Sequence, residues 1–436
     1  MEEQREFLDT EEWLNQGKKL LEAGDSEGAE PYFDRILKKN PMHQDAYLYK
    51  GIVKADQGKL EEAQELFVKA SMIDRKQPEP YFHLGNIAFM RNSYTDSIKN
   101  YNKAIALGYD QPDVYFHRGM VFEETEEFEE AIRSYNKAIQ TDELTPDYRV
   151  RKATVYLMSA RYEEALQTLE ELRMVAPDHI DCYHLASAAY MAQGKFDEAE
   201  AILSKGEELF PADRELFFDR LRVLNTKGDI SRALEYVEQA GKMELNEEER
   251  QEVYLARGKL LGQTGDLDGA MESFEAAYAI RLDGQEDGES LYFLMNACLA
   301  KGDYEKLLEY AKKAEPYSQA NPYTLCSKYY QALSLGRLKK TEAREAYKEA
   351  IRFYRRISME NPDRVEAYLF RAMCHKDLKE YDKAMELLDY VGRLQPQNGN
   401  LHVIRGNLLK EQGKQREAEK EFALARKAHA IIPGEV

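Results

Sequence analysis

Apolar and polar residues follow one another along much of this chain with the spacings of amphipathic helices, and the whole pattern repeats. The segments YLYKGIVKADQGKLEEAQELFVKA, YFHLGNIAFMRNSYTDSIKNYNKA and YFHRGMVFEETEEFEEAIRSYNKA begin 34 residues apart, at Tyr47, Tyr81 and Tyr115. In each segment an aromatic residue is followed by a small residue four positions on, and later by Ala, a large apolar residue and Ala. Spacings of three, four and seven are helical, so each segment is predicted to form two antiparallel helices.

The small residues mark the place where the two helices of a pair are expected to cross. Gly51, Gly85 and Gly119 lie on the first helices, while Ala63 and Ala131 lie opposite them on the second helices. Ser97 replaces Ala in the middle segment. Added bulk at these positions would force the helices apart, at about 1–3 kcal/mol for Ala131→Leu.

The pattern resembles the tetratricopeptide repeat family over nearly the whole chain. Trp13, Gly17, Ala29, Phe33 and Pro41 supply the family's positions in the first repeat. The resemblance implies an all-α, right-handed superhelical solenoid of about twelve antiparallel helix pairs, with the first helices lining the concave side. Counted from the family's first position, the repeats begin at Thr10, Gln44, Pro78, Pro112, Pro146, Ile180, Arg214, Gln251, Gly288, Thr324, Val365 and Gly399.

The array is expected to have a short lead at residues 1–9, repeats 1–7 at 10–250 and repeats 8–12 at 251–436, the last ending in a short tail. Loop insertions are predicted near 241–250, where MELNEEER lies, and near 283–289, where the polar stretch LDGQEDGES is typical of a flexible loop. The segment IRFYRRISMENPD predicts a long second helix in the tenth repeat. The small residue of the first helix is replaced in the seventh, ninth and tenth repeats, by Leu221, Met295 and Gln331.

Composition narrows the class of protein. With 43% hydrophobic residues the chain can form a core, and its formal charge of -19 disfavours binding to nucleic acid. No apolar run is long enough for membrane insertion, and the start MEEQREFLDTEEW has neither a basic nor an apolar targeting segment. The four cysteines, which lack the spacing of a zinc or redox site, favour a cytoplasmic location. They are Cys182, Cys298, Cys326 and Cys374.

The acidity itself is a poor clue to a partner. The second position of the repeat is acidic in ten of the twelve units, from Glu11 to Glu366. Carboxylates in a first helical turn are favoured by the helix dipole. The negative charge is therefore largely explained by acidic residues in the first turns of helices, which recur in each repeat.

The family's groove-facing positions carry a candidate binding site in the second to fourth repeats. The resemblance implies that these side chains bind an extended peptide or a partner helix. The alternative is that Phe82 and Phe116 only pack against the adjacent first helix, and that His83 and His117 are solvated or core-edge residues. The predicted peptide-binding residues are Leu48, Tyr49, Ile52, Phe82, His83, Asn86, Phe89, Met90, Phe116, His117 and Met120.

A second, polar lining follows in later repeats and has the chemistry to receive an acidic segment. The alternative is a mixed solvated face, because Asp147, Asp181 and Asp219 are interleaved with it. A carboxylate clamp of the co-chaperone type is disfavoured, since Phe82 stands where Asn86 would need a Lys four residues earlier. The polar set consists of Arg151, His184, Arg222, Lys259 and Lys328.

Enzyme signatures are weak. The chain has no phosphate-binding glycine loop, no nucleophile elbow and no H-E-x-x-H. His179, Asp181, Cys182 and His184 are possible metal ligands, but Cys182 and His184 fall on roughly opposite faces of a predicted helix. We therefore predict no enzyme, no cofactor and no metal.

The sequence thus predicts a non-enzymatic scaffold whose partner is a protein or peptide. The alternative is a peptide-sensing signalling receptor whose superhelix changes shape on ligand binding. Self-association through an uncapped last repeat is also open, because Leu424, Ala428 and Ile431 would expose the face that meets a further unit.

Overall fold

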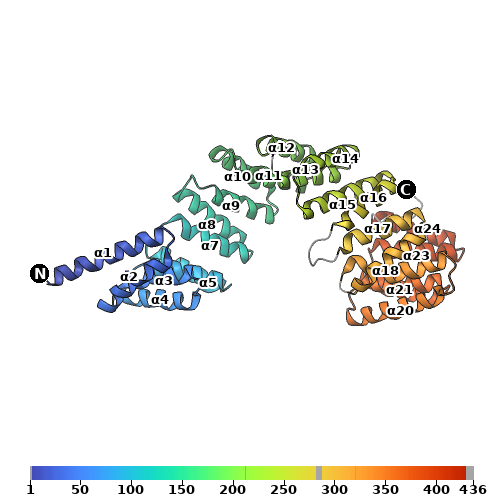
Figure 1. Ribbon diagram of the computed structural model, residues 1–436. Coiled ribbons are helices and arrows are strands. Elements are labelled where there is room, and N and C mark those ends of the chain that lie inside the picture. The colour runs from blue at the N-terminus through green and yellow to red at the C-terminus, as the bar shows by residue number, and fades with distance from the viewer. Residues whose placement is uncertain (1, 212, 281–286, 320, 429–436) are drawn as a thin grey trace. The chain divides into compact units, whose positions relative to one another are not determined.

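The computed structural model describes residues 2–211, 213–280, 287–319 and 321–428. Over these residues the fold is all-α, with twelve pairs of antiparallel helices and no strand (Figure 1). Each predicted repeat corresponds to one pair, so the sequence prediction of an all-α repeat architecture is confirmed. The chain divides into two compact units, residues 1–223 and 224–436. The predicted division at 250 and the handedness of the superhelix stay predictions.

The first unit holds six complete helix pairs and most of α13, stacked in chain order in Figure 1. Its helices are α1 (Glu2–Glu22), α2 (Ser26–Lys39), α3 (Gln44–Asp56), α4 (Leu60–Ile73), α5 (Glu79–Met90), α6 (Tyr94–Ala106), α7 (Pro112–Glu124), α8 (Phe128–Thr141), α9 (Pro146–Met158), α10 (Tyr162–Val175), α11 (Asp181–Ala192), α12 (Phe196–Leu209) and α13 (Arg214–Lys227).

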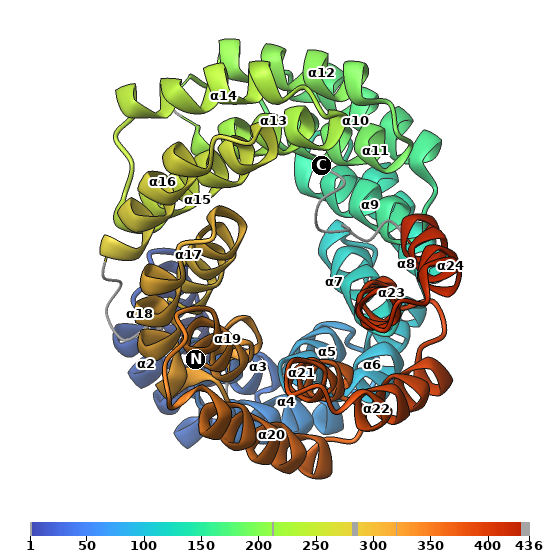
Figure 2. The ribbon, with the colours of Figure 1, turned by 90° about the vertical axis from the view of Figure 1, so that its right-hand side faces the viewer.

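The second unit continues the same arrangement. Figure 2 shows the first helices α19 and α21 side by side. Their partners, the second helices α20 and α22, form a second layer next to them. Its helices are α14 (Ile230–Gln239), the 3₁₀ turn η1 (Ala240–Lys242), α15 (Glu247–Thr264), α16 (Leu267–Ala279), α17 (Gly288–Lys301), α18 (Tyr304–Ala314), η2 (Glu315–Tyr317), η3 (Pro322–Thr324), α19 (Ser327–Arg337), α20 (Ala343–Glu360), α21 (Val365–Asp377), α22 (Tyr381–Leu394), α23 (Gly399–Glu411) and α24 (Gln415–Lys427).

Most helix pairs close around a small residue of the first helix, the exceptions being those of Leu221 and Met295. A Cβ atom added at Gly51 or Gly119 would lie 2.5 Å from the ring of Phe67 or Tyr135 on the second helix. Ser97 Oγ donates a hydrogen bond of 2.9 Å to the carbonyl oxygen of Gly85, which shows the close backbone approach expected there. Interiors are packed too densely to absorb an extra methyl group at such a contact.

The turn between the two helices of a pair marks the repeat register. One residue of each turn has a positive φ, which L side chains rarely adopt. Glycine occupies seven of these twelve positions and relieves the strain there. The twelve residues are Gly24, Gly58, Asn92, Glu126, Ala160, Gly194, Gly228, Gly265, Gly302, Lys339, Lys379 and Gly413.

The tenth repeat corrects one detail of the sequence alignment. Its left-handed turn residue is Lys339, one position later than the predicted register gives. The small residue of its first helix is accordingly Ala332, which is completely buried. Gln331 instead contacts the preceding repeat, because its Nε2 donates a hydrogen bond of 3.0 Å to the carbonyl oxygen of Ala311 on α18.

The predicted insertions have different outcomes. In MELNEEER the last residues form an added first turn of α15, closed by a capping box in which Asn246 and Glu249 each accept the other's backbone N–H. Residues 281–286 of the second predicted insertion lie outside the described residues, Asp287 caps the next helix, and α17 begins at Gly288. The long second helix predicted in the tenth repeat is confirmed, because α20 runs for 18 residues. At the other end of the chain, α1 begins at Glu2, within the expected lead.

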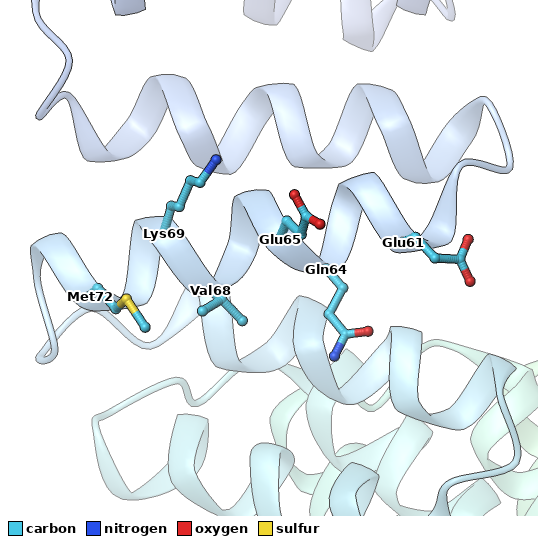
Figure 3. Close-up of a pocket in the computed structure, with 6 residues that line it drawn as sticks. All are labelled: Glu61, Gln64, Glu65, Val68, Lys69 and Met72. Atoms are coloured by element: carbon cyan, nitrogen blue, oxygen red, sulfur yellow. The ribbon is translucent and has the colours of Figure 1, made fainter.

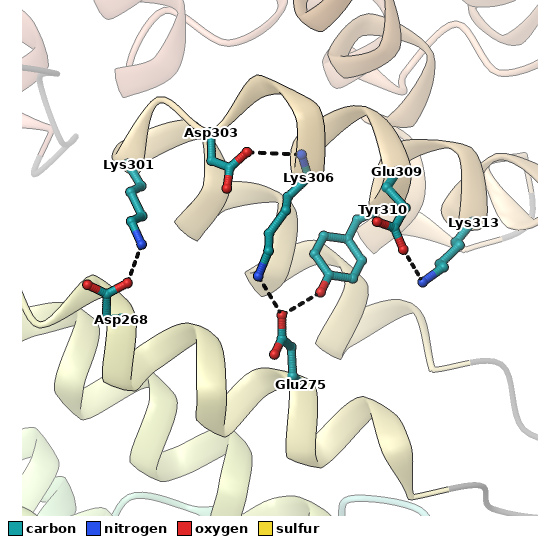
Figure 4. Close-up of polar contacts among 8 residues, drawn as sticks. All are labelled: Asp268, Glu275, Lys301, Asp303, Lys306, Glu309, Tyr310 and Lys313. Atoms are coloured by element: carbon teal, nitrogen blue, oxygen red, sulfur yellow. Dashed lines mark hydrogen bonds and ion pairs between the residues drawn. The ribbon is translucent and has the colours of Figure 1, made fainter.

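Polar contacts join the second helices of consecutive repeats at the surface of the second unit (Figure 4). Glu275 of α16 accepts hydrogen bonds from Tyr310 Oη at 2.7 Å and from Lys306 Nζ at 3.2 Å, both on α18. Lys301, the last residue of the first helix α17, pairs with Asp268 of α16 between the same two repeats. These contacts fix neighbouring repeats beside one another, while the apolar core beneath supplies most of the stability.

Candidate functional site

The predicted peptide-binding residues lie on α3, α5 and α7, which contact one another in succession. Two of them belong to the interior. Leu48 is 6% exposed and Phe82 is 5% exposed. The Phe82 ring stacks on Tyr109 with centroids 5.0 Å apart and meets the edge of His117 at 5.8 Å. Both side chains are therefore committed to packing within and between repeats.

The two groove histidines are also held by their own surroundings. His83 stacks on Phe67 at 4.9 Å, and burial lowers the pKa of His83 to about 4. The imidazole is therefore neutral at physiological pH. His117 Nδ1 lies 2.7 Å from the carbonyl oxygen of Asp113, a distance at which it donates a hydrogen bond. Both rings therefore make contacts within the repeats, His83 with an aromatic ring and His117 with the backbone.

The remaining apolar residues form an accessible strip. Ile52, Phe89 and Met120 are half-buried on successive first helices, and Met90 at the end of α5 is 63% exposed. Tyr49 stacks on Phe33 at 5.9 Å, which leaves part of its ring accessible. Phe116 is tied more closely, with Tyr148 at 5.1 Å and Tyr135 at 5.9 Å. We name Ile52, Phe89, Met90 and Met120 the apolar strip.

Tyrosines of the second helices orient the polar residues beside this strip. Tyr101 Oη donates to Asn86 Oδ1 at 2.7 Å, which leaves the Asn86 amide nitrogen without a partner among the described residues. Tyr135 Oη donates in the same way to Glu123 Oε2 at 2.7 Å. Glu123 was not predicted from the sequence, although its place one turn after Gly119 on the same helix was a usable signal. Such bonds fix a side chain before any ligand arrives.

The positive charges of the second predicted lining are compensated by the protein itself. Every one of its basic residues has a carboxylate partner in the chain. Arg151 pairs with Glu123 at 3.1 Å, and Lys259 pairs with Glu289 at 2.8 Å. His184 Nδ1 lies 2.7 Å from Asp219, whose hydrogen bond raises the pKa of His184.

The other two basic residues of that lining follow the same rule. Arg222 also pairs with Asp219, at 2.9 Å, and Lys328 pairs with Glu315. Four of the five pairs join consecutive repeats, the exception being that of Arg222 with Asp219 on the same helix. The five residues therefore act as links of the scaffold itself, which is close to the mixed solvated face weighed as the alternative.

The residues around His179 do not converge. His179 Nδ1 is 3.5 Å from Asp181, whereas His184 turns away to Asp219. Cys182 is 2% exposed, and burial raises the pKa of its thiol to about 11. Within the part of the chain that the structure describes, no group of three His, Cys, Asp or Glu side chains is arranged to hold a metal ion.

Surface hollows lie over second helices. One of 470 Å³ is lined by residues of α4 alone, where Val68 and Met72 are flanked by Glu61 and Glu65 (Figure 3). Two more, of 630 and 410 Å³, adjoin α20.

The face predicted for self-association lies at the end of the array. There Leu424 is 43% exposed, whereas Ile431, which was predicted with it, lies outside the described residues. None of the helices in the described ranges combines the length and apolar character of a membrane span.

Repeated antiparallel helix pairs, each packed on the next, define an α-solenoid repeat protein. Family comparison agrees: tetratricopeptide repeat models match residues 14–71, 85–126, 184–242, 226–287 and 343–408. The chain belongs to the tetratricopeptide repeat family, and its fold is that of a protein–protein interaction scaffold. A further model, described as anaphase-promoting complex, cyclosome, subunit 3, matches residues 124–206. No curated protein matches the chain.

Several solved structures resemble parts of the chain. YrrB, described as a TPR protein with an unusual peptide-binding site, is 20% identical with a TM-score of 0.39, and the match covers 45% of this chain and 97% of YrrB. PilF from Pseudomonas aeruginosa is 15% identical with a TM-score of 0.42, over 50% of this chain and 97% of its own. A tetratricopeptide repeat protein from Parabacteroides merdae is 18% identical with a TM-score of 0.35, over 66% and 99%.

Proposed function

We propose that this protein is a non-enzymatic scaffold that binds an extended or helical segment of a partner protein along the first helices of repeats two to four. The observation that carries the proposal is the apolar strip. Met90 is 63% exposed, and Ile52, Phe89 and Met120 pack against the core while each stays partly accessible. Apolar side chains that remain accessible on adjoining helices are typical of an interaction surface.

Binding would combine apolar anchoring with one oriented polar group. Apolar side chains of the partner would cover Ile52, Phe89 and Met120 and remove them from water. The Asn86 amide nitrogen, whose neighbouring oxygen is held by Tyr101, would donate to a main-chain carbonyl of the partner. Since the first helices are fixed by their repeats, little order would be lost on binding.

Photo-crosslinking in cells would test this placement. A benzophenone side chain introduced at Met90 should crosslink a partner, and the same group at Met174 should not. Met174 is 81% exposed on α10, a second helix, and serves as a matched methionine outside the strip.

Affinity measurements on the crosslinked partner provide the second readout. Met90→Glu should weaken its binding by about tenfold or more, because a carboxylate would enter an apolar contact. Met174→Glu should leave binding unchanged. Equal crosslinking at both sites, or equal binding by both variants, would place the partner elsewhere on the array.

A further inference from the structure

The outer face of α20 concentrates positive charge in a chain whose formal net charge is -19. Between Arg337 and Arg356 there are eight Lys or Arg residues and three Glu residues. Four basic residues and a methionine recur every three or four positions along α20, which places them on one face of the helix. We name this face the α20 stripe; it comprises Arg344, Lys348, Arg352, Arg355 and Met359.

The side chains of the stripe reach into solvent. The Lys348 and Arg352 side chains are 50% and 64% exposed, and Met359 is 72% exposed. At the helical rise of 1.5 Å per residue, the stripe from Arg344 to Met359 is about 22 Å long. An extended peptide of about seven residues spans the same length. The stripe therefore has the dimensions of a short linear segment.

Two adjoining hollows follow this face and share Arg352. The hollow of 630 Å³ lies between α20 and the turn that joins α21 to α22, where Lys379 and Lys383 add two more cations. The hollow of 410 Å³ continues over Arg355, Arg356 and Met359. The surface is thus a pair of open, shallow hollows along which basic side chains are gathered.

The acidic residues in the larger hollow are already engaged. Glu380 lies 2.7 Å from His375 Nδ1 and 3.2 Å from Lys383 Nζ. Asp377 accepts hydrogen bonds from the hydroxyl groups of Tyr329 and Tyr347, at 3.1 and 3.0 Å. It also pairs with Lys376 at 2.8 Å. Among the described residues, these two carboxylates make their ion pairs with other partners and none with the cations of α20.

On α20 itself Glu345 forms ion pairs with the stripe, and Glu360 lines the smaller hollow. Glu345 pairs with both Lys348 at 3.3 Å and Arg352 at 3.0 Å. Among the described residues, Arg344, Arg355 and Arg356 have no ion-pair partner. Close like charges repel one another, so a ligand that brings negative charge would relieve this repulsion.

We infer that the α20 stripe and its two hollows form a second docking surface, which binds an acidic segment of a partner protein. Guanidinium groups donate two parallel hydrogen bonds to a carboxylate, so Arg344 and Arg355 would each hold one acidic side chain, and Arg352 would exchange its contact with Glu345 for another. Met359, exposed at the end of the stripe, would contact an apolar residue of the same segment. This surface lies on a second helix and is independent of the apolar strip.

Fluorescence anisotropy with the full chain would test the inference. The probe is a labelled peptide of alternating Glu and Leu, long enough to span the stripe, and its control is the same peptide with Gln in place of Glu. The test variant is Arg344→Glu with Arg352→Glu and Arg355→Glu. The matched variant is Arg416→Glu with Lys420→Glu and Lys427→Glu, which changes the net charge equally at exposed residues of α24.

The inference predicts that the wild-type chain binds the Glu peptide and not the Gln peptide. The α20 variant should lose about tenfold or more in affinity, and the α24 variant less than about threefold. Because all six residues are exposed, circular dichroism should show an unchanged fold. Equal losses in both variants would reduce the effect to overall charge and overturn the inference. So would no binding of the Glu peptide, or binding of anionic lipid vesicles in place of the peptide.

Discussion

At the scale of single residues, the size of the first-helix residue at the crossing is matched to the side chain of the second helix. Glycine faces an aromatic ring, as Gly119 faces Tyr135 and Gly51 faces Phe67. The ninth repeat reverses the sizes, with Met295 on the first helix and Ala311 on the second, both completely buried in one cluster. The departure at Met295 is therefore an exchange of volume within the pair, which a core tolerates best.

A methyl group at the crossing should destabilise the protein. In Gly119→Ala the new Cβ would lie 2.5 Å from the Tyr135 ring, and we expect a loss of about 2 kcal/mol in the free energy of unfolding. Gly262→Ala is the matched control, because it lies near the end of α15 with nothing within 4 Å of the added Cβ. The control should gain up to about 1 kcal/mol from helix propensity. Urea unfolding of both variants checks the opposite signs.

His83 should make stability depend on pH in the acidic range. Its pKa is lowered to about 4 by burial, against about 6.5 in an unfolded chain. As the pH falls below 6.5 the unfolded state binds a proton that the folded state does not, so stability decreases. Between pH 7 and pH 5 this amounts to about 2 kcal/mol.

The variant His83→Gln isolates this contribution from that of the carboxylates. Its free energy of unfolding should fall by about 2 kcal/mol less than that of the wild-type chain between pH 7 and pH 5. Parallel pH profiles for the two proteins would show that the ring is not buried in its neutral form. Above pH 7 the two profiles should run in parallel.

At the scale of elements, the turn within each helix pair needs one left-handed residue, and five repeats meet this need without glycine. Ala160, with φ of 56°, has no side-chain hydrogen bond to offset the strain. Asn92, with φ of 57°, belongs to a residue type that tolerates this region.

Ala160→Gly should therefore stabilise the protein by about 1 kcal/mol, since the relieved strain exceeds the added entropy of the unfolded chain. Asn92→Gly should change stability little, which makes it the matched control. Thermal unfolding of the two variants compares them directly. A destabilised Ala160→Gly variant would contradict the idea that these turns are strained.

The sequence predicted the helix pairs because each carries its own signals, namely the small crossing residue, the closing Ala and the turn. It missed the register of the tenth repeat because a shift of one residue at Lys339 leaves the helical pattern intact. The burial of Phe82 depends on Tyr109, which follows a left-handed Gly108 between two repeats. The partner of Lys259, Glu289, is 30 residues away. Contacts of this kind depend on how repeats stack, which a single repeat does not encode.

At the scale of the whole molecule, the two proposed surfaces lie in different compact units. The apolar strip belongs to residues 1–223 and the α20 stripe to residues 224–436. Within each unit the helices contact helices of the same repeat and of the adjacent repeats. Stability in such arrays is nearly a sum of local terms, so each part should fold without the other.

Two fragments would test this independence. Residues 1–228 end after α13, whose Leu216 and Val223 pack in one cluster with α11 and α12 and so cover the last complete pair. Residues 246–436 begin at Asn246, the capping residue of α15. Both should show helical circular dichroism and cooperative thermal unfolding. The second fragment should bind the Glu peptide within about threefold of the full chain, and the first should not bind it. Loss of structure in either fragment would mean that the two units stabilise each other. If both fragments fold and bind the Glu peptide equally, the peptide does not bind at the α20 stripe.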